Sequence, residues 1–323
     1  MSIAGNSKAD GYPAAVSDHA GELAALGAAS CWVVSALSFE TAGKRIGSLS
    51  LNLLRLSLAL LPLGLWGLVT RGQLIPLDAD AHTWTWLSAS ALFGFVIGDL
   101  CLFRAFVLIG PRLGVLIMAS APVWTALLGL VFLGESLGGR DLAGMGLTLV
   151  GIAWAITQRP STKPAPESTP TPTPTPTGQW AYSTEGVLLA LAGAVGQAIG
   201  LVLSKHGMGD YDPFAATQIR VMVGVVGFAA VITGLRWWPK IGVALRDRDA
   251  MKATAVGAVF GPFLGVSCSL IAVQLAPTGI AATLMATTPI LMLPVSWIRG
   301  DRFGVAGVLG ALIAFAGVVL LLT

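Results

Sequence analysis

Ten apolar runs with few or no charged residues constrain the fold of this chain more than any other feature. In hydrocarbon every backbone polar group needs a partner within its own segment, so runs of this kind are predicted to be helices. About 20 residues span the hydrocarbon core of a bilayer, and all but the short fifth run reach that length. The runs cover residues 22–41, 51–70, 84–108, 113–133, 142–157, 186–204, 214–234, 252–275, 278–298 and 304–322. The sequence therefore predicts an all-α integral membrane protein with ten transmembrane helices.

The composition agrees with a membrane protein. Charged residues make up 11% of the 323 residues and hydrophobic residues 55%, whereas soluble domains carry about 25% charged residues. Three cysteines form no CxxC motif, and three histidines lie near the ends of apolar runs, so no disulfide framework, metal centre or other cofactor is expected. The net charge of +3 comes from loops beside the membrane. The expected partners are the lipid bilayer and a small-molecule substrate, and not nucleic acid.

A linker rich in proline and threonine, residues 158–184, divides the chain into two halves. The halves cover 22–157 and 185–323, and a polar tail, 1–21, precedes them. This tail lacks the basic-then-apolar order of a signal peptide, so the first run is expected to stay as a helix.

The two halves resemble each other in sequence. A shift of 167 residues gives nine identities between positions 93 and 122 without a gap, and a shift of 165 aligns the first two runs of each half. The matches include Phe93 with Phe260, Cys101 with Cys268, Met118 with Met285, Pro122 with Pro289 and Arg55 with Arg220. Because five helices are an odd number, the second half must enter the membrane from the opposite side.

Two inverted five-helix repeats around a central cavity follow from this count. Inverted repeats are typical of secondary transporters, which open one site alternately to either side of the membrane. Ten helices can enclose a cavity within a single chain, so a monomer is expected. Twelve Lys and Arg residues fall in the odd-numbered loops and four on the other side, which predicts that both termini lie outside and the linker in the cytoplasm.

Several stretches carry a resemblance to a known family. The first half contains AASCW at 28–32, FRAFVLIG at 103–110 and a long stretch at 113–156 with Pro122, Glu135 and a glycine-studded fifth run. The second half repeats this pattern at 276–322, with Asp301 or Arg302 near the place of the glutamate. The chain resembles the drug/metabolite transporter superfamily, in particular bacterial ten-helix proteins with two EamA-type halves.

That resemblance implies a basket of helices around a central cavity, with the fifth and tenth helices supporting the rest. It implies a place in the bacterial inner membrane. It also implies export or exchange of small metabolites such as amino acids, drugs or nucleotide sugars.

Asp99 is the sharpest candidate for a functional residue, because it lies near the middle of the third run. A charge at that depth costs at least about 2.5–3.5 kcal/mol on insertion scales. It is predicted either to bind and release a proton during transport or to be a neutral carboxyl group bonded to neighbouring helices. Its counterpart in the second half is Val266, and Arg104 lies about 140° around the helix from it.

Arg55 and Arg220 occupy matching places near the starts of the second and seventh runs. Each arginine either extends to a lipid headgroup or faces the cavity and binds a substrate carboxylate or phosphate. Asn52 lies one turn from Arg55 and could extend a polar strip. Glu40 and Lys44 have the spacing of an ion pair along one helix.

The remaining candidates for a substrate-binding wall are Trp32, Trp124, Gln197, Met118 and Met285. Indole and amide groups offer hydrogen bonds, and methionine adapts to varied shapes, although ordinary packing is the alternative for the methionines.

Matching prolines and glycines predict local backbone features. Pro122 and Pro289 are expected to break the helical ladder at equivalent depths and to act as hinges. GxxxG patterns at 94–98 and 261–265 predict a close pair formed by the third and eighth helices.

A secondary transporter that exports amino acids or related compounds, with proton coupling as an option, is the leading hypothesis. No GxxxxGK[ST] loop occurs, so direct use of ATP is not expected. A multidrug or nucleoside or sugar exporter of the same fold is an alternative, and a passive channel or scaffold is another. An intramembrane enzyme would need a nucleophile–base pair, an HExxH helix or paired carboxylates, which the apolar runs lack, so catalysis is not expected.

Overall fold

The computed structural model describes residues 19–157, 183–292, 294–295 and 305–322, and these residues form helices and no strand. Within them, seven helices are long and apolar enough to cross a membrane. Two shorter apolar helices, Thr278–Leu291 and Leu309–Leu322, occur in the second half. The predicted all-helical class is confirmed for this part of the chain. Nearly all of the predicted tail and linker, together with Asp301 and Arg302, lies outside the described residues.

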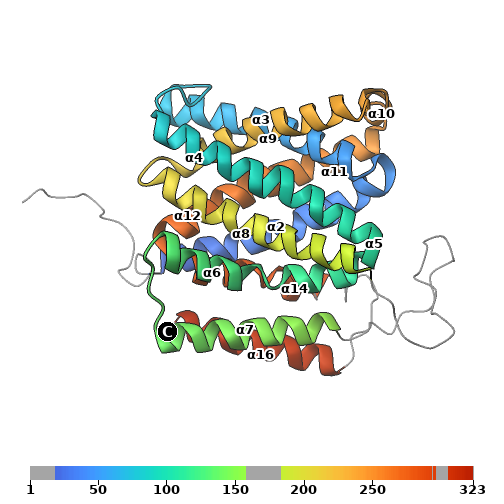
Figure 1. Cartoon of the computed structure of the whole chain (residues 1–323). Coiled ribbons are helices and arrows are strands. Elements are labelled where there is room, and N and C mark those ends of the chain that lie inside the picture. The colour runs from blue at the N-terminus through green and yellow to red at the C-terminus, as the bar shows by residue number, and fades with distance from the viewer. Residues whose placement is uncertain (1–18, 158–182, 293, 296–304, 323) are drawn as a thin grey trace, which may run out of the picture.

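The helices run roughly parallel to one another (Figure 1). Those of the first half are α2 Ala20–Ile46, α3 Ser48–Arg71, α4 Ala81–Ala91, η1 Leu92–Gly98, α5 Asp99–Met118, α6 Ala121–Phe132 and α7 Gly139–Thr157. Those of the second half are α8 Thr184–Met208, α9 Pro213–Gly234, α10 Trp238–Ala244, α11 Arg248–Ala258, η2 Val259–Gly265, α12 Val266–Leu275, α13 Thr278–Met285, α14 Thr288–Leu291 and α16 Val305–Leu322.

Helical structure continues through residues 110–112, where the sequence predicts a loop between the third and fourth runs. As a result, α5 contains the end of one predicted span and the beginning of the next. By length and hydropathy the two candidate spans here are Ala81–Ile109 and Leu113–Phe132. The fourth run is instead interrupted later, between α5 and α6.

The repeat seen in the sequence recurs in the local backbone structure. The segments η1 and η2 are both π-helical, and the shift of 167 residues superimposes their bounds. The same shift relates Asp80 to Asp247, and each of these carboxylates accepts a hydrogen bond from the first turn of the helix that it caps, α4 and α11. Hydrogen bonds from Arg45 hold the pKa of Asp247 below its ordinary value. Equivalent sequence signals therefore produce equivalent elements in the two halves.

The glycines of the two GxxxG patterns contact the first helix of the opposite half. A Cβ atom at Gly200 of α8 would lie 2.9 Å from the Cα of Gly94, and one at Gly261 would lie 2.5 Å from the Oγ of Ser35 in α2. The predicted pair between the third and eighth helices is therefore wrong. Small residues on α8, Gly193, Gly196 and Gly200, offer a surface that lets the backbone of η1 approach closely.

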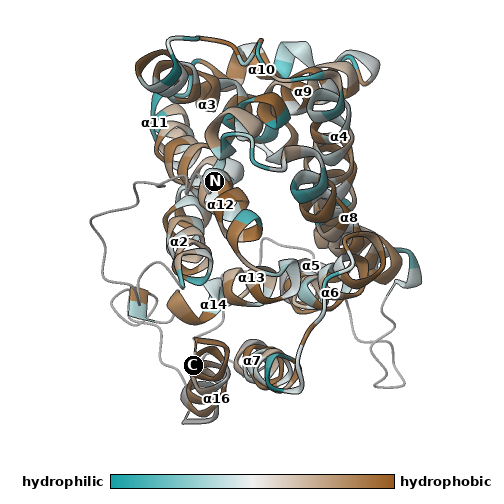
Figure 2. Ribbon diagram, turned by 90° about the vertical axis from the view of Figure 1, so that its left-hand side faces the viewer, coloured by the Kyte–Doolittle hydropathy of each residue, from teal (hydrophilic) through white to brown (hydrophobic). Residues whose placement is uncertain are grey.

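Helices α7 and α16 form a pair at one edge of the bundle, below the ring of helices in Figures 1 and 2. Their glycines lie at the crossing, because a Cβ atom at Gly151 would lie 2.6 Å from the carbonyl oxygen of Gly310 and one at Gly317 would lie 2.7 Å from that of Gly144. A shift of 166 residues relates Gly144 to Gly310 and Gly151 to Gly317. The two helices thus cross through matched positions.

A polar cluster joins the two halves at one end of the bundle. Glu135, just beyond α6, accepts hydrogen bonds from Lys205 Nζ at 2.7 Å and from the backbone N and Oγ1 of Thr278 at 2.9 and 2.6 Å. Lys205 also donates to the carbonyl oxygen of Ala276 at 2.8 Å. A residue of the first half therefore caps α13 of the second half, where the helix dipole favours negative charge.

A second cluster lies between the halves at the same end. Arg71 donates to Asp78 and, at 3.0 Å, to the hydroxyl of Tyr211, which itself donates to Asp78 at 3.0 Å. Because Arg71 and Asp78 belong to the first half and Tyr211 to the second, this cluster also fixes the two halves against each other.

Glu135→Gln is expected to lower the free energy of unfolding by about 1.5–3 kcal/mol, because hydrogen bonds to a charged group are lost or weakened. The measurement is thermal unfolding of the purified protein in detergent. Glu40→Gln is the matched control. Its ion pair with Lys44, at 2.5 Å, is exposed and expected to contribute less than about 1 kcal/mol. Equal effects of the two substitutions would contradict the role given to Glu135.

Candidate functional site

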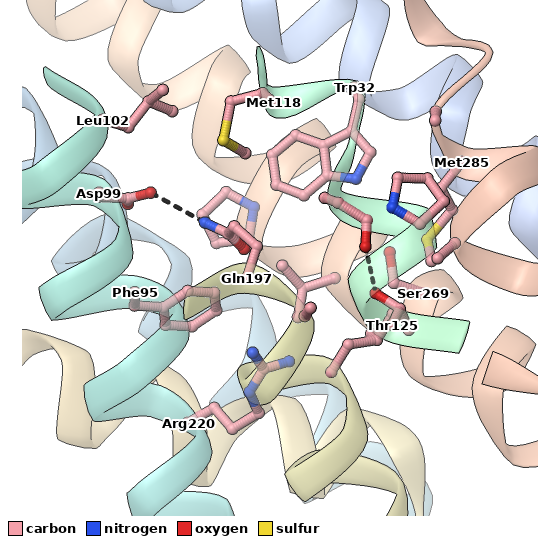
Figure 3. Close-up of a pocket in the computed structure, with 18 of the residues that line it drawn as sticks. Trp32, Phe95, Asp99, Leu102, Met118, Thr125, Gln197, Arg220, Ser269 and Met285 are labelled. Atoms are coloured by element: carbon pink, nitrogen blue, oxygen red, sulfur yellow. Dashed lines mark hydrogen bonds between the residues drawn. The ribbon is translucent and has the colours of Figure 1, made fainter. Parts of the chain in front are cut away.

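A cavity of about 420 Å³ lies inside the helical bundle, between the two halves. Its wall is contributed by α2, α3, η1, α5, α6, α8, α9, η2, α12 and α13 (Figure 3). Seven of the nine predicted wall residues line it, namely Trp32, Arg55, Asp99, Met118, Gln197, Arg220 and Met285. Pro122, one of the predicted hinges, lines it as well.

The lining residues come in matched pairs from the two halves. The sequence shifts of 167 and 165 residues relate a lining residue of one half to a lining residue of the other six times. The pairs are Trp32 with Gln197, Arg55 with Arg220, Phe95 with Pro262, Asp99 with Val266, Leu102 with Ser269 and Met118 with Met285. The cavity is thus built from equivalent positions, although the side chains at most of them differ.

Two predicted wall residues do not line the cavity. Asn52 is 1% exposed, and its amide nitrogen and oxygen have no hydrogen-bond partner among the described residues. Trp124 donates to Ser120 Oγ at 3.3 Å. It lies about 100° around α6 from the face that carries Pro122 and Thr125, which do line the cavity.

Asp99 forms an ion pair with Arg55 of α3, inside the same half. Its other carboxylate oxygen accepts a hydrogen bond at 3.2 Å from Gln197 of α8, as Figure 3 shows. Gln197 also donates to the carbonyl oxygen of Gly94 at 3.1 Å, so one amide group ties η1 and α5 to the opposite half. Arg104 instead faces Glu185 at 3.7 Å, where both side chains are exposed.

Arg220 is the second cation of the cavity, and it is 4% exposed. It makes neither a hydrogen bond nor an ion pair with any residue that the structure describes, and its Nε is buried without a partner. The guanidinium group stacks on the ring of Phe95, 4.6 Å from the ring centroid. Val266 occupies the place in the second half that Asp99 occupies in the first.

The helix interruptions lie just before the two prolines. Helix α5 ends at Met118 and α6 begins at Ala121, while α13 ends at Met285 and α14 begins at Thr288. Pro122 and Pro289 then occupy the first turn of the following helix, where a missing N–H leaves no helical bond unmade.

Hydroxyl groups bond to the carbonyls of the interrupted turns. Ser120 donates to Ile117 at 2.6 Å and Thr287 donates to Leu284 at 2.7 Å, again at matched positions. Pro289 borders a smaller neighbouring cavity, which shares Trp32, Met118 and Met285 with the main one.

Sequence reasoning missed several residues of the wall, chiefly Phe95, Leu102, Thr125, Pro262 and Ser269. Most are apolar or carry a lone hydroxyl group, so nothing in their residue type indicated a site. Three of them lie at matched places next to the GxxxG patterns, and applying the shift of 167 residues to Asp99 and its neighbours would have pointed to them.

The family comparison supplies the remaining observation. The model of the EamA-like transporter family matches residues 19–157 and 184–323, one match for each half. The chain belongs to the EamA-like transporter family. The resemblance to the drug/metabolite transporter superfamily is thereby confirmed, and this EamA-like protein is a multi-pass membrane transporter of that type.

A solved structure described as "Crystal structure of protein" shares the fold of this EamA-like chain. The TM-score is 0.68 at 17% sequence identity, with 93% of this chain and 95% of that chain covered. The comparison with curated proteins gives no match.

Proposed function

We propose that this EamA-like protein is a secondary transporter that moves small organic metabolites, such as amino acids or related compounds, across the bacterial inner membrane by alternating access. The observation that carries the proposal is the cavity lined by matched positions of both halves. A site between two equivalent halves can keep its contacts while the halves exchange conformations, so that it opens first to one side and then to the other. Export is the proposed direction.

The proposed topology has ten transmembrane helices in two inverted repeats of five. A Cβ atom at Gly21, in the first turn of α2, would lie 2.8 Å from the Cβ of Ala276, and one at Gly144 would lie 2.9 Å from Leu321 near the end of α16. The described chain therefore begins and ends at the end of the bundle that carries the Glu135 cluster, in agreement with an even number of crossings. The distribution of Lys and Arg supports termini outside and a cytoplasmic linker.

Labelling of single cysteines tests the inversion. Leu77→Cys and Val243→Cys lie between the second and third spans of their halves, at side chains that are 79% and 70% exposed. In a background without Cys31, Cys101 and Cys268, an impermeant thiol reagent added to whole cells should label Leu77→Cys, whereas Val243→Cys should react only after the cells are opened. Labelling of both from the same side would exclude inverted repeats.

Counterflow into proteoliposomes tests the transport activity. The protein is reconstituted with a panel of amino acids, nucleosides, sugars and cationic drugs, each unlabelled inside and labelled outside. A carrier should show saturable uptake that is stimulated by internal substrate, whereas a channel would conduct without saturation. Chemical conversion of a compound by the purified protein would support an enzyme instead.

Proton coupling is proposed through Asp99, the carboxylate of the cavity that faces both Arg55 and Gln197. Uptake should then respond to an imposed pH gradient in the wild type, and the response should be lost in Asp99→Asn. A wild-type protein whose counterflow rate is the same at all pH values would retire this part of the proposal.

A further inference from the structure

The two arginines of the cavity have opposite electrostatic surroundings, although they occupy matched positions. Arg55 is neutralised by Asp99 within its own half, whereas the place of that aspartate is taken by Val266 near Arg220. Among the described lining residues, Arg55, Asp99 and Arg220 are the ionisable groups that carry charge at neutral pH. Two arginines and one aspartate leave the cavity with one unpaired positive charge, and this charge belongs to Arg220.

We propose that Arg220 binds the carboxylate of the transported substrate, an inference that rests on the proposed transport function. A buried cation without a counter-charge is costly, and its contact with the face of Phe95 offsets only part of that cost. Figure 3 shows the guanidinium group directed into the space between Phe95 and Gln197. A carboxylate placed there can accept two parallel hydrogen bonds from one guanidinium group.

The charge balance favours a carboxylate over a phosphate group. A carboxylate carries one negative charge and would bring the ionised side chains of the cavity to neutrality. A phosphate monoester carries between about −1.5 and −2 charges at neutral pH and would leave excess negative charge in a largely apolar enclosure.

The remainder of the wall fits an apolar substrate body. Leu102, Met118, Trp32 and Met285 lie across the cavity from Arg220 (Figure 3). Methionine and indole side chains provide contact area without demanding a fixed shape. The substrate class is therefore a small metabolite with one carboxylate and an apolar body.

Four compounds with one branched apolar body separate the contributions of the charged groups. They are 4-methylpentanoate, which has only the carboxylate, L-leucine, leucinamide and 3-methylbutylamine. The primary measurement is the shift in thermal unfolding of the detergent-purified full chain, because it does not depend on how fast each compound crosses lipid. We expect both carboxylates to bind at least tenfold more tightly than the amide and the amine.

Variants assign that preference to one residue. Arg220→Gln should lose the stabilisation by 4-methylpentanoate, and Arg220→Lys should retain part of it because the charge remains. Arg104→Gln, at an exposed arginine, is the matched control and should bind as the wild type does. Should Arg220→Gln fail to fold, the wild type and Arg220→Lys still give the comparison among the four compounds.

The outcomes separate this proposal from the proposed function. Equal binding of the amide and the acid, or unchanged binding in folded Arg220→Gln, would overturn carboxylate recognition. Absence of stabilisation by either acid would overturn it too, while saturable counterflow of a nucleoside, sugar or drug would still support the transporter. Failure of all counterflow would count against the transport function itself.

Discussion

Asp99→Val is expected to lower the free energy of unfolding by about 3–5 kcal/mol, the cost of removing one partner from a buried ion pair. Both side chains are largely enclosed, with 10% of Asp99 and 12% of Arg55 exposed. Valine is the residue at the matched position in the second half, so its shape is compatible with such a site. The change would leave two unpaired guanidinium groups, those of Arg55 and Arg220, in the wall of one cavity. Thermal or denaturant unfolding in detergent measures the effect.

A double-mutant cycle shows whether the loss comes from the pair. Arg55→Met alone should also destabilise the protein, because Asp99 would then be buried with only Gln197 as a partner. The double variant, Asp99→Val with Arg55→Met, should be less destabilised than the sum of the single variants, since neither charge remains. Additive effects would mean that the two side chains do not interact in the folded protein.

Gly151→Ala is expected to destabilise the pair formed by α7 and α16 by about 1–3 kcal/mol, the usual cost of overpacking. The added Cβ atom would lie 2.3 Å from the backbone nitrogen of Ala314 and 2.6 Å from the carbonyl oxygen of Gly310. Because both neighbours are backbone atoms, a side-chain rotation cannot relieve the clash, and the helices must move apart. The measurement is the unfolding temperature of the purified protein.

Gly146→Ala is the matched control on the same helix. A Cβ atom at Gly146 has no neighbour within 4 Å, so the substitution adds helix propensity without a clash. It should leave stability unchanged or raise it by up to about 1 kcal/mol. A loss of stability similar to that of Gly151→Ala would indicate that the effect comes from removing glycine flexibility and not from the crossing.

Much of the local structure could be predicted from the sequence. The apolar runs locate the described helices, since the cost of an unpaired backbone group in lipid leaves few alternatives to a helix. The internal repeat anticipates that both interruptions come just before Pro122 and Pro289. It also singled out Arg55 and Arg220 as a matched pair, and both line the cavity.

Relations between helices could not be predicted in this way. Arg104 is the nearest arginine to Asp99 in the sequence, yet the partner is Arg55, 44 residues away on another helix. The GxxxG patterns correctly indicated close contacts, but the partners turned out to be α2 and α8. Asn52 was expected to follow Arg55 into the cavity, and it is enclosed elsewhere. Each of these outcomes depends on how two helices are rotated against each other.

The sequence by itself determined that the chain forms apolar helices in two related halves, because hydrophobic length and repeated residues act within each segment. Only the tertiary structure decided which charged groups meet. Placing α3 beside α5 neutralises Arg55 with Asp99, while the same arrangement in the second half brings Arg220 near Val266. An ion pair depends on distances of a few ångströms between side chains of different helices, and such distances are fixed only when the helices pack.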